Sequence, residues 1–275
     1  MSKSNLYNQI ARCQGDPSTC SIHMQRPQGW QDLFFYDEDR NRISYGYAPP
    51  HTDTEFRGTV VLTHGYDEDK NLYYETIDNY QSRGFAVYAL DWEGHRKSPD
   101  SNPEDALLPS TDGLERHTDD LAFFIQNVVN PTRDYSKPLI MSTHSMGGHI
   151  GMLFLRKYPD TFDGAIMSAP MLDIYNFGLG SWSRPLFRTA FNFASRIGLR
   201  DVRLPDLEEI TQAFNFKNGM QGMRQLLYNE RRENDIDRRV GRPTFGWVAK
   251  AYETIVPSLQ EDFLRAVRTP LLIGS

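Results

Sequence analysis

Short apolar runs alternate along the chain with longer segments in which apolar residues recur at helical spacing. Each run has the length of a strand that is buried on both faces of a parallel sheet. The runs lie at residues 58–63, 85–90, 139–142, 164–168 and 270–275. Between them, apolar stripes predict helices near residues 72–80, 114–128, 150–158, 245–255 and 259–267. Strand-like runs at 33–36 and 43–47 flank a turn-rich centre and predict a hairpin. This alternation predicts an α/β fold with a doubly wound, mostly parallel sheet.

The alternation fails between residues 171 and 243. This stretch has a helical pattern at 185–197 and a weaker one at 221–230, but no run that predicts a buried strand. We therefore expect an α/β core formed by residues 1–170 and 244–275. The intervening residues 171–243 are expected to be a helical lid, or cap, inserted into that core.

Composition excludes several classes of protein. Lys and Arg total 30 and Asp and Glu total 36, which gives a net charge of −6, and 12% of the residues are aromatic. Aromatic residues at this level supply the core material that a disordered chain lacks. The longest near-apolar stretch, 121–129, is shorter than the roughly 20 residues that span a bilayer. A mildly acidic chain also lacks the basic patch that nucleic acids require, so no nucleic-acid partner is expected.

The cysteine count and the first residues bear on cofactors and location. Cys13 and Cys20 are expected to be free thiols, because two thiols without a partner pair make neither a zinc site nor a disulfide framework. We expect no metal and no organic cofactor. Residues 1–20 show no apolar segment of a secretory signal peptide. The expected location is the cytoplasm, with peripheral contact at the inner face of the membrane as a further expectation.

Ser145 follows the run at 139–142 directly and precedes a helical pattern, in the sequence T-H-S-M-G-G. A nucleophilic serine is raised out of a sheet on a sharp strand-to-helix turn, where crowding requires small residues two positions before and after it. Gly147 meets this requirement, whereas Thr143 stands where the usual pattern has Gly. The pattern makes Ser145 the candidate nucleophile. The alternative is a serine that occupies such a turn by chance.

The run at 58–63 ends in the sequence H-G-Y. Acyl transfer turns a carbonyl oxygen into an anion, and fixed backbone N–H groups must face it. In the strand–turn–helix arrangement one donor is the residue after the nucleophile, here Met146, and the other lies in the loop after the strand that ends in H-G, here Tyr66. Both residues act through the backbone, so their side chains are expected to serve packing.

Four motifs follow the predicted strands in a fixed order: H-G, D-x-x-G-H-x-x-S, H-S-M-G-G and S-A-P-M-L. Over roughly residues 30–275 this order resembles the α/β-hydrolase superfamily, and more narrowly its lysophospholipase and monoacylglycerol lipase branch of serine hydrolases. Arg96 departs from that pattern, because the family usually has Gly after G-H. The resemblance implies that Ser145 is the nucleophile and that the Tyr66 and Met146 amides form the oxyanion hole. It also implies that residues 171–243 form a lid over an acyl-binding pocket.

The acid and the histidine of a catalytic triad are not found in this chain. The fold's order is serine, acid, histidine, and the acid should follow the strand at 270–275, with the histidine one strand later. The histidines are His23, His51, His64, His95, His117, His144 and His149. Asp173 is a candidate acid, but an acid without a histidine does not activate a serine. We therefore expect the chain to be truncated at its C-terminus, with the last strand and helices missing.

Aromatic residues of the predicted lid have two interpretations. They form either a small core of the lid, or an acyl-binding groove or membrane-facing patch that contacts the substrate. The residues are Phe177, Trp182, Phe187, Phe191 and Phe193.

Several charged residues also need an interpretation. His117 and Asp120, on the helix predicted at 114–128, are expected to be structural. Glu93 and His95 are expected to lie in a solvated loop, with substrate contact as the alternative. Arginines at 231–242 are interleaved with acidic residues, so a solvated, self-paired surface is expected there rather than a phosphate-headgroup site.

Together these features predict a serine carboxylester hydrolase that acts on single-chain lipid esters, either lysophospholipids or monoacylglycerols, through an acyl-enzyme on Ser145. Alternatives within the same fold are a short-chain esterase and an aminopeptidase-like amidase. If the natural chain ends at Ser275, the absent histidine and Thr143 favour a non-catalytic acyl-binding protein. The expected partners are a lipid ester and, through the lid, a membrane surface.

Overall fold

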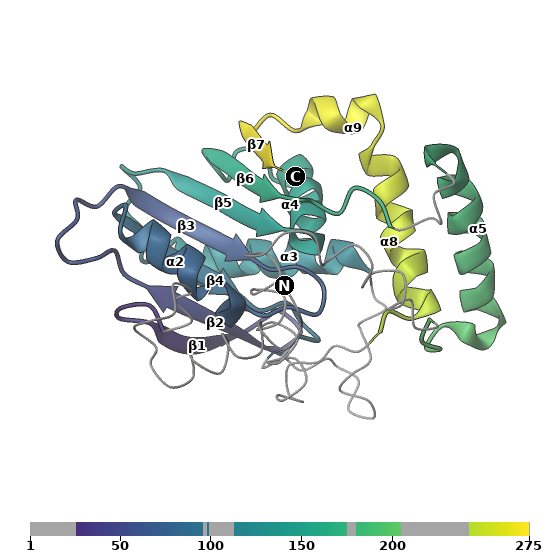
Figure 1. Ribbon diagram of the computed structural model, residues 1–275, viewed down its shortest axis with the longest axis horizontal. Coiled ribbons are helices and arrows are strands. Elements are labelled where there is room, and N and C mark those ends of the chain that lie inside the picture. Colours follow the sequence, from purple (N-terminus) through teal and green to yellow (C-terminus); the bar gives the residue numbers. More distant parts are fainter. Residues whose placement is uncertain (1–25, 96–97, 99–112, 175–179, 205–241, 275) are drawn as a thin grey trace, which may run out of the picture.

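The computed structural model describes residues 26–95, 98, 113–174, 180–204 and 242–274. Within them, seven strands form one sheet in the order β1-β2-β4-β3-β5-β6-β7 (Figure 1). The strands are β1 (Gln31–Tyr36), β2 (Arg42–Ala48), β3 (Gly58–Thr63), β4 (Phe85–Leu90), β5 (Leu139–His144), β6 (Gly164–Ser168) and β7 (Leu271–Gly274). The pairs β1–β2 and β2–β4 are antiparallel, and all other neighbours are parallel. The predicted mostly parallel sheet and the N-terminal hairpin are confirmed.

Helices cover both faces of this sheet, as a doubly wound fold requires. The α-helices are α2 (Tyr74–Gln81), α3 (Leu114–Phe124), α4 (Met146–Lys157), α5 (Arg184–Ala194), α8 (Phe245–Ser258) and α9 (Glu261–Ala266). Alternate strand residues point to opposite faces. Accordingly, Val60 and Leu62 pack in the cluster with Ile77 of α2, whereas Val61 packs in the larger cluster beneath α3, α4 and α8. None of the helices in the described part of the chain is long and apolar enough to span a bilayer.

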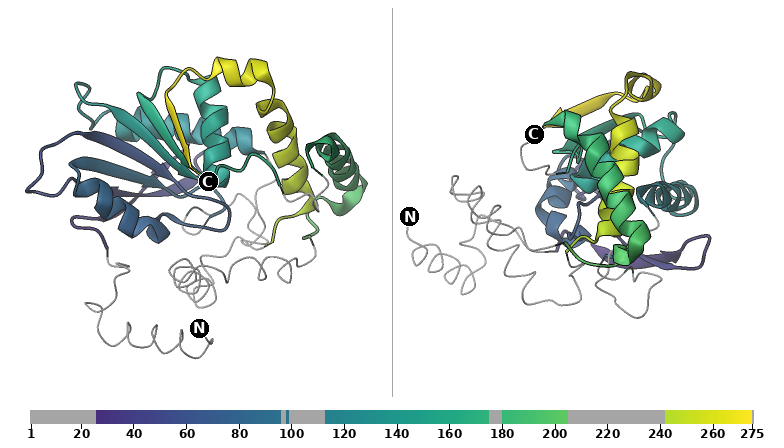
Figure 2. Two further views of the ribbon diagram at one scale, coloured as in Figure 1. Left: turned by 45° about the horizontal axis from the view of Figure 1, so that its top comes forward. Right: turned by 90° about the vertical axis from the view of Figure 1, so that its right-hand side faces the viewer.

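Strand β7 lies at one edge of the sheet (Figure 2). The prediction of a strand at 270–275 is confirmed, but the prediction that it is buried is wrong, because Leu272 and Ile273 are 65% and 52% exposed. An apolar run shows that a strand is suited to burial, not that anything covers it. Among the described residues, only β6 pairs with β7.

Residues from the middle of the predicted lid, which was expected at 171–243, pair with residues at its C-terminal end beside α8. Arg203 forms a β-bridge with Thr244, and the amide of Leu204 donates to the carbonyl of Pro243 over 2.9 Å. Helix α5 confirms most of the helix predicted at 185–197. It is followed by a further turn at Ser195–Leu199, in which Gly198 has φ +96°, a conformation that favours glycine.

Helix α5 packs against α8, which separates it from the sheet (Figures 1 and 2). Several predictions lie outside the described residues. They concern Cys13, Cys20, Arg96, Phe177, the helix at 221–230 and most of the arginine-rich run at 231–242.

Candidate active site

Ser145 stands on a sharp turn between β5 and α4. Its backbone angles are φ +50° and ψ −116°, a region that residues other than glycine rarely adopt and that is typical of strained functional positions. Its carbonyl accepts hydrogen bonds from the amides of Gly148, at 2.9 Å, and Met171, at 2.8 Å. The turn therefore holds Ser145 at the carboxyl end of the parallel strands, where ligands bind in open α/β sheets.

Close packing around this turn depends on glycines of α4. A Cβ atom added to Gly147 would lie 2.5 Å from the carbonyl oxygen of His64, so no larger residue fits without a shift. Thr143 is buried, and a Cβ added to Gly151 would lie 3.3 Å from its methyl group. Thr143 is larger than the usual glycine, and it fits here because Gly151 of α4, which faces it, has no side chain.

The loop that follows β3 begins with His64 and Gly65, and we call it the H-G loop. It lies beside Ser145, because a Cβ added to Gly65 would be 3.0 Å from the Cβ of Ser145. Nδ1 of His64 is 2.8 Å from the carbonyl oxygen of Gly65. A carbonyl only accepts, so Nδ1 carries the proton, and Nε2 accepts from the amide of Trp92 at 3.2 Å. The Gly65 carbonyl and the Tyr66 N–H belong to one planar trans peptide and point in opposite directions. By holding that carbonyl, His64 orients the Tyr66 N–H.

Glu68 ties the same loop to the residue before Ser145. Its Oε2 accepts hydrogen bonds from the amide of Gly65 at 2.7 Å, the hydroxyl of Tyr73 at 2.6 Å and Nδ1 of His144 at 3.1 Å. Burial alone would raise the pKa of Glu68, but these hydrogen bonds outweigh it and the pKa is lowered. The hydrogen bond to Glu68 in turn raises the pKa of His144, which favours the protonated imidazolium beside the Glu68 carboxylate. Sequence reasoning missed Glu68; the one available signal was a carboxylate three residues after H-G.

A buried ion pair lies behind the loop. Lys70 has no exposed side-chain surface; its Nζ lies 2.5 Å from Oδ2 of Asp91 and 2.8 Å from Oγ of Ser44. The amide of Lys70 also donates to Oδ1 of Asp91 at 2.8 Å, and that oxygen is 3.8 Å from Nε2 of His64. Lys70 and Asp91 therefore fix the end of the H-G loop to β2 and to the end of β4.

Met146 is the first residue of α4, and in the described part of the chain its amide forms no hydrogen bond. Free amides at a helix N-terminus, together with the helix dipole, favour an anion at this position. The Met146 side chain is buried, and the Tyr66 ring packs against Trp247 of α8 with ring centroids 4.6 Å apart. Both side chains serve packing, as expected, while their backbones lie beside Ser145.

Within the described ranges, no histidine forms a hydrogen bond with the Ser145 hydroxyl. His149 lies inside the molecule, with Nε2 2.9 Å from Oγ1 of Thr254. Asp173, the candidate acid, accepts a hydrogen bond from Nε of Arg184 at 2.8 Å. It therefore pairs with Arg184 of α5 rather than with a histidine.

The loop after β4 differs from its prediction. Glu93 and His95 are only 2% and 3% exposed, so the expectation of a solvated loop is wrong. Glu93 is 3.0 Å from Nε of Arg116 on α3, which brings the carboxylate into the interior. Burial lowers the pKa of His95 well below its usual value. His117 and Asp120 are buried and 3.7 Å apart, in agreement with a structural role.

The aromatic residues of the predicted lid that lie in the described part of the chain divide into two groups. The rings of Phe187 and Phe191 stack on Tyr252 of α8, with centroids 6.3 and 6.2 Å apart, and form a small core. Trp182 and Phe193 are 70% and 64% exposed. The described residues show no contact between these side chains and Ser145, so their assignment to the substrate site stays a prediction.

Comparison with known proteins identifies what the chain is similar to. The family described as serine aminopeptidase, S33, matches residues 54–274. The chain is 31% identical over 140 residues to a monoacylglycerol lipase of Mycolicibacterium smegmatis, covering 49% of this chain and 45% of that protein. It is 34% identical over 115 residues to lysophospholipase L2 of Escherichia coli K12, covering 42% of this chain and 33% of that protein. The matches thus span about half and a third of these curated relatives.

Solved structures share the fold at low sequence identity. A soluble variant of the Saccharomyces cerevisiae monoglyceride lipase, in complex with a substrate analogue, aligns with a TM-score of 0.61 and 18% identity, over 93% of this chain and 78% of that one. A thermostable carboxyl esterase of Bacillus coagulans gives a TM-score of 0.63 and 16% identity, over 89% and 78%. These likenesses show the α/β-hydrolase fold.

Proposed function

Because the chain belongs to the serine aminopeptidase S33 family of α/β-hydrolases, we propose that it is a serine carboxylester hydrolase acting on single-chain lipid esters. The observation that carries this proposal is Ser145, held at φ +50° beside the H-G loop and before the free amide of Met146. The names of the curated relatives, a monoacylglycerol lipase and a lysophospholipase, support monoacylglycerols and lysophospholipids as the substrate class.

In the proposed reaction, the Ser145 hydroxyl oxygen attacks the acyl carbonyl carbon. The carbonyl oxygen becomes an anion that accepts hydrogen bonds from the Tyr66 and Met146 amides. One such donor is worth about 2.7–4 kcal/mol in other enzymes. The tetrahedral intermediate expels the alcohol and leaves the acyl group on Ser145, and water then releases the carboxylic acid.

A general base must take the Ser145 proton and pass it to the leaving alcohol. We propose that this base is a histidine oriented by an acid; among the described residues no histidine forms a hydrogen bond with the Ser145 hydroxyl.

The test uses the complete natural protein, a fluorophosphonate probe and a chain-length series of esters. We expect Ser145 to be labelled, Ser145→Ala to lose labelling and turnover, and long single-chain esters to be preferred over short ones. Ser136→Ala, at an exposed surface serine, is the control and should be labelled like the wild type. Labelling that survives Ser145→Ala removes Ser145 as the nucleophile.

A second candidate is an aminopeptidase-like amidase, which the family's description favours. Aminoacyl amides added to the same substrate series decide between the two. Faster turnover of amides than of every ester would replace the lipid-ester proposal. Binding of fatty acids without labelling or turnover would instead support a non-catalytic acyl-binding protein.

A further inference from the structure

Gly65, in the H-G loop, is enclosed by three side chains. A Cβ atom added to it would lie 2.8 Å from Oε2 of Glu68, 3.0 Å from the Cβ of Ser145 and 3.2 Å from Nδ1 of His144. A larger residue would therefore have to displace its neighbours. Glycine fits, but its backbone is also the least restricted of all residues. The direction of the N–H group that follows it, that of Tyr66, therefore needs restraint from other groups.

Two hydrogen bonds supply this restraint, one on each side of the Gly65 Cα. The amide of Gly65 donates to Oε2 of Glu68 at 2.7 Å, and its carbonyl accepts from Nδ1 of His64 at 2.8 Å. The first bond holds the peptide group before the Cα, and the second holds the peptide group after it. Together they restrain φ and ψ, the two soft backbone torsions of a residue. Glu68 thus provides half of the restraint on the Tyr66 N–H.

Glu68 is itself held in place. The same Oε2 accepts from the hydroxyl of Tyr73 at 2.6 Å and from Nδ1 of His144 at 3.1 Å, and the side chain is only 18% exposed. Asp67, directly before Glu68, has φ +56°, a left-handed conformation that tightens a turn and that Asp tolerates better than most residues. Because His144 directly precedes Ser145, the carboxylate connects the H-G loop to the turn of the candidate nucleophile.

The charge of Glu68 needs a balance in this position. An oxyanion formed beside Ser145 would be repelled by an uncompensated carboxylate in a partly buried site. The hydrogen bond from His144 to Glu68 raises the pKa of His144, and the imidazolium that this favours supplies a positive charge. In the described part of the chain, Glu68 and the ring of Tyr73 are the titratable groups that face His144.

We propose that Glu68 is a positioning residue of the reaction: through the Gly65 amide it directs the Tyr66 N–H at the oxyanion, and through His144 it fixes that loop relative to Ser145. This inference rests on the proposed function, which supplies the oxyanion. The Tyr66 N–H acts mainly on the transition state, because only there does the acyl oxygen carry the full charge. Loss of Glu68 should therefore lower kcat and leave KM nearly unchanged.

Two variants of the complete natural protein separate positioning from charge. Glu68→Ala removes the acceptor and should lower kcat by up to about 100-fold, the effect of a misplacement of about 1 Å. Glu68→Gln keeps an oxygen for the Gly65 amide and should recover most of that loss. The wild type should lose activity at high pH, where His144 gives up its proton and leaves the Glu68 charge unbalanced. That loss should be absent from Glu68→Gln.

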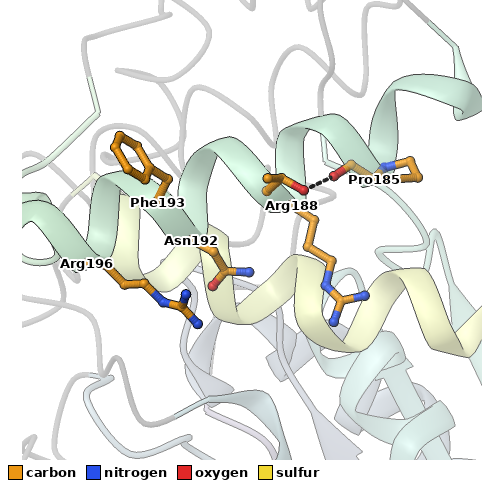
Figure 3. A pocket seen from close by; sticks show the side chains of 6 residues that line it. Pro185, Arg188, Asn192, Phe193 and Arg196 are labelled. Atoms are coloured by element: carbon orange, nitrogen blue, oxygen red, sulfur yellow. Dashed lines mark hydrogen bonds between the residues drawn. The ribbon is translucent and has the colours of Figure 1, made fainter.

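Two controls test the loss of a charge elsewhere. Glu115→Gln removes an exposed carboxylate from α3. Arg188→Gln removes an arginine that lines an open hollow along α5 (Figure 3), and α8 separates this helix from the sheet. Both variants should have the kcat and the pH profile of the wild type.

Two further measurements distinguish positioning from a general loss of structure. A trifluoromethyl ketone with an acyl chain adds to a serine and forms an oxyanion, so its inhibition constant should weaken by the same factor as kcat/KM. Hydrogen exchange of the segment 64–66, followed by mass spectrometry, should be faster in Glu68→Ala than in the wild type. Urea unfolding checks that each variant is folded.

Three results would overturn the inference. They are wild-type kcat in Glu68→Ala, a loss confined to KM, and a Glu68→Gln variant no more active than Glu68→Ala. Turnover of aminoacyl amides but not of esters, with the same loss in Glu68→Ala, contradicts the proposed substrate alone. If the wild type turns over neither, the proposed function fails, and faster or unchanged exchange at 64–66 then supports or overturns the role of Glu68.

Discussion

His149 links the stability of the fold to pH. It lies on α4, with its side chain buried against Thr254 of α8. The Thr254 hydroxyl donates to the carbonyl of Ala251 at 3.0 Å, so it accepts from Nε2–H of His149, and Nδ1 remains a buried lone pair without a partner. Adding a proton to Nδ1 would place a charge in the interior. Burial accordingly lowers the pKa of His149 from 6.5 to about 4.

The sign and size of the effect follow from this pKa. Above pH 6.5 the imidazole is neutral in both the folded and the unfolded chain. Below pH 6.5 the unfolded chain binds a proton that the folded chain does not accept until about pH 4, so the free energy of unfolding falls across this window. At about 1.4 kcal/mol per pH unit, the total loss from His149 is about 3 kcal/mol. That is a large share of the roughly 5–15 kcal/mol that stabilises a typical domain.

The variant His149→Gln isolates this contribution. A glutamine amide can keep the hydrogen bond to Thr254 and does not titrate. Urea unfolding, followed by tryptophan fluorescence at pH 7.5 and 4.5, gives the free energy of unfolding of each protein. We expect the wild type to lose about 2–3 kcal/mol more than His149→Gln between these pH values. His95 is present in both proteins, so its contribution cancels.

His51→Gln is the control for removal of an imidazole near the surface, where His51 is 3.1 Å from Asp78. Parallel loss of stability in the wild type and His149→Gln would refute the reasoning. It would mean that the folded protein accepts the proton on His149 without cost.

Two further substitutions test the packing and charges around Ser145. Gly147→Ala puts a methyl group 2.5 Å from the carbonyl of His64 and should lower stability by about 1–3 kcal/mol, measured by thermal unfolding. In Gly164→Ala the nearest atom is 3.5 Å away, and a drop as large as that of Gly147→Ala would speak against the steric argument. Lys70→Met leaves the Asp91 carboxylate buried and unpaired, which should cost about 3–5 kcal/mol in chemical unfolding. Adding Asp91→Asn should recover part of that loss, and no recovery would contradict the pairing.

The central strands and the turn at Ser145 could be predicted from the sequence because their signals are local. A continuous apolar run suits a strand that is covered on both sides, and the strands at 58–63 and 85–90 have the predicted bounds. The small residues around Ser145 likewise report a crowded turn within a few positions of the chain. Properties that depend on one segment and its nearest neighbours could therefore be predicted from the sequence.

Properties that depend on residues far apart in the chain could not be predicted in this way. The burial of β7 depends on what lies at its outer edge, which its own four residues do not specify. Glu68 and His144 pair across 76 positions, and neither residue's local sequence indicates the other. Glu93 is a charged residue, so its local sequence predicts exposure to solvent. Its burial depends on Arg116 of α3, which pairs with it in the fold.

The bridge between Arg203 and Thr244 has a consequence for how this molecule can diversify. A segment whose two ends are joined at one point of a rigid frame can change in length with little effect on that frame. Each doubling of such a loop costs only about 0.6 kcal/mol in closure entropy. Because Arg203 and Thr244 are paired, a change in the number of residues between them leaves the two points of attachment in place beside α8. We therefore expect insertions and deletions between these two residues to leave the turn at Ser145 and the H-G loop unmoved.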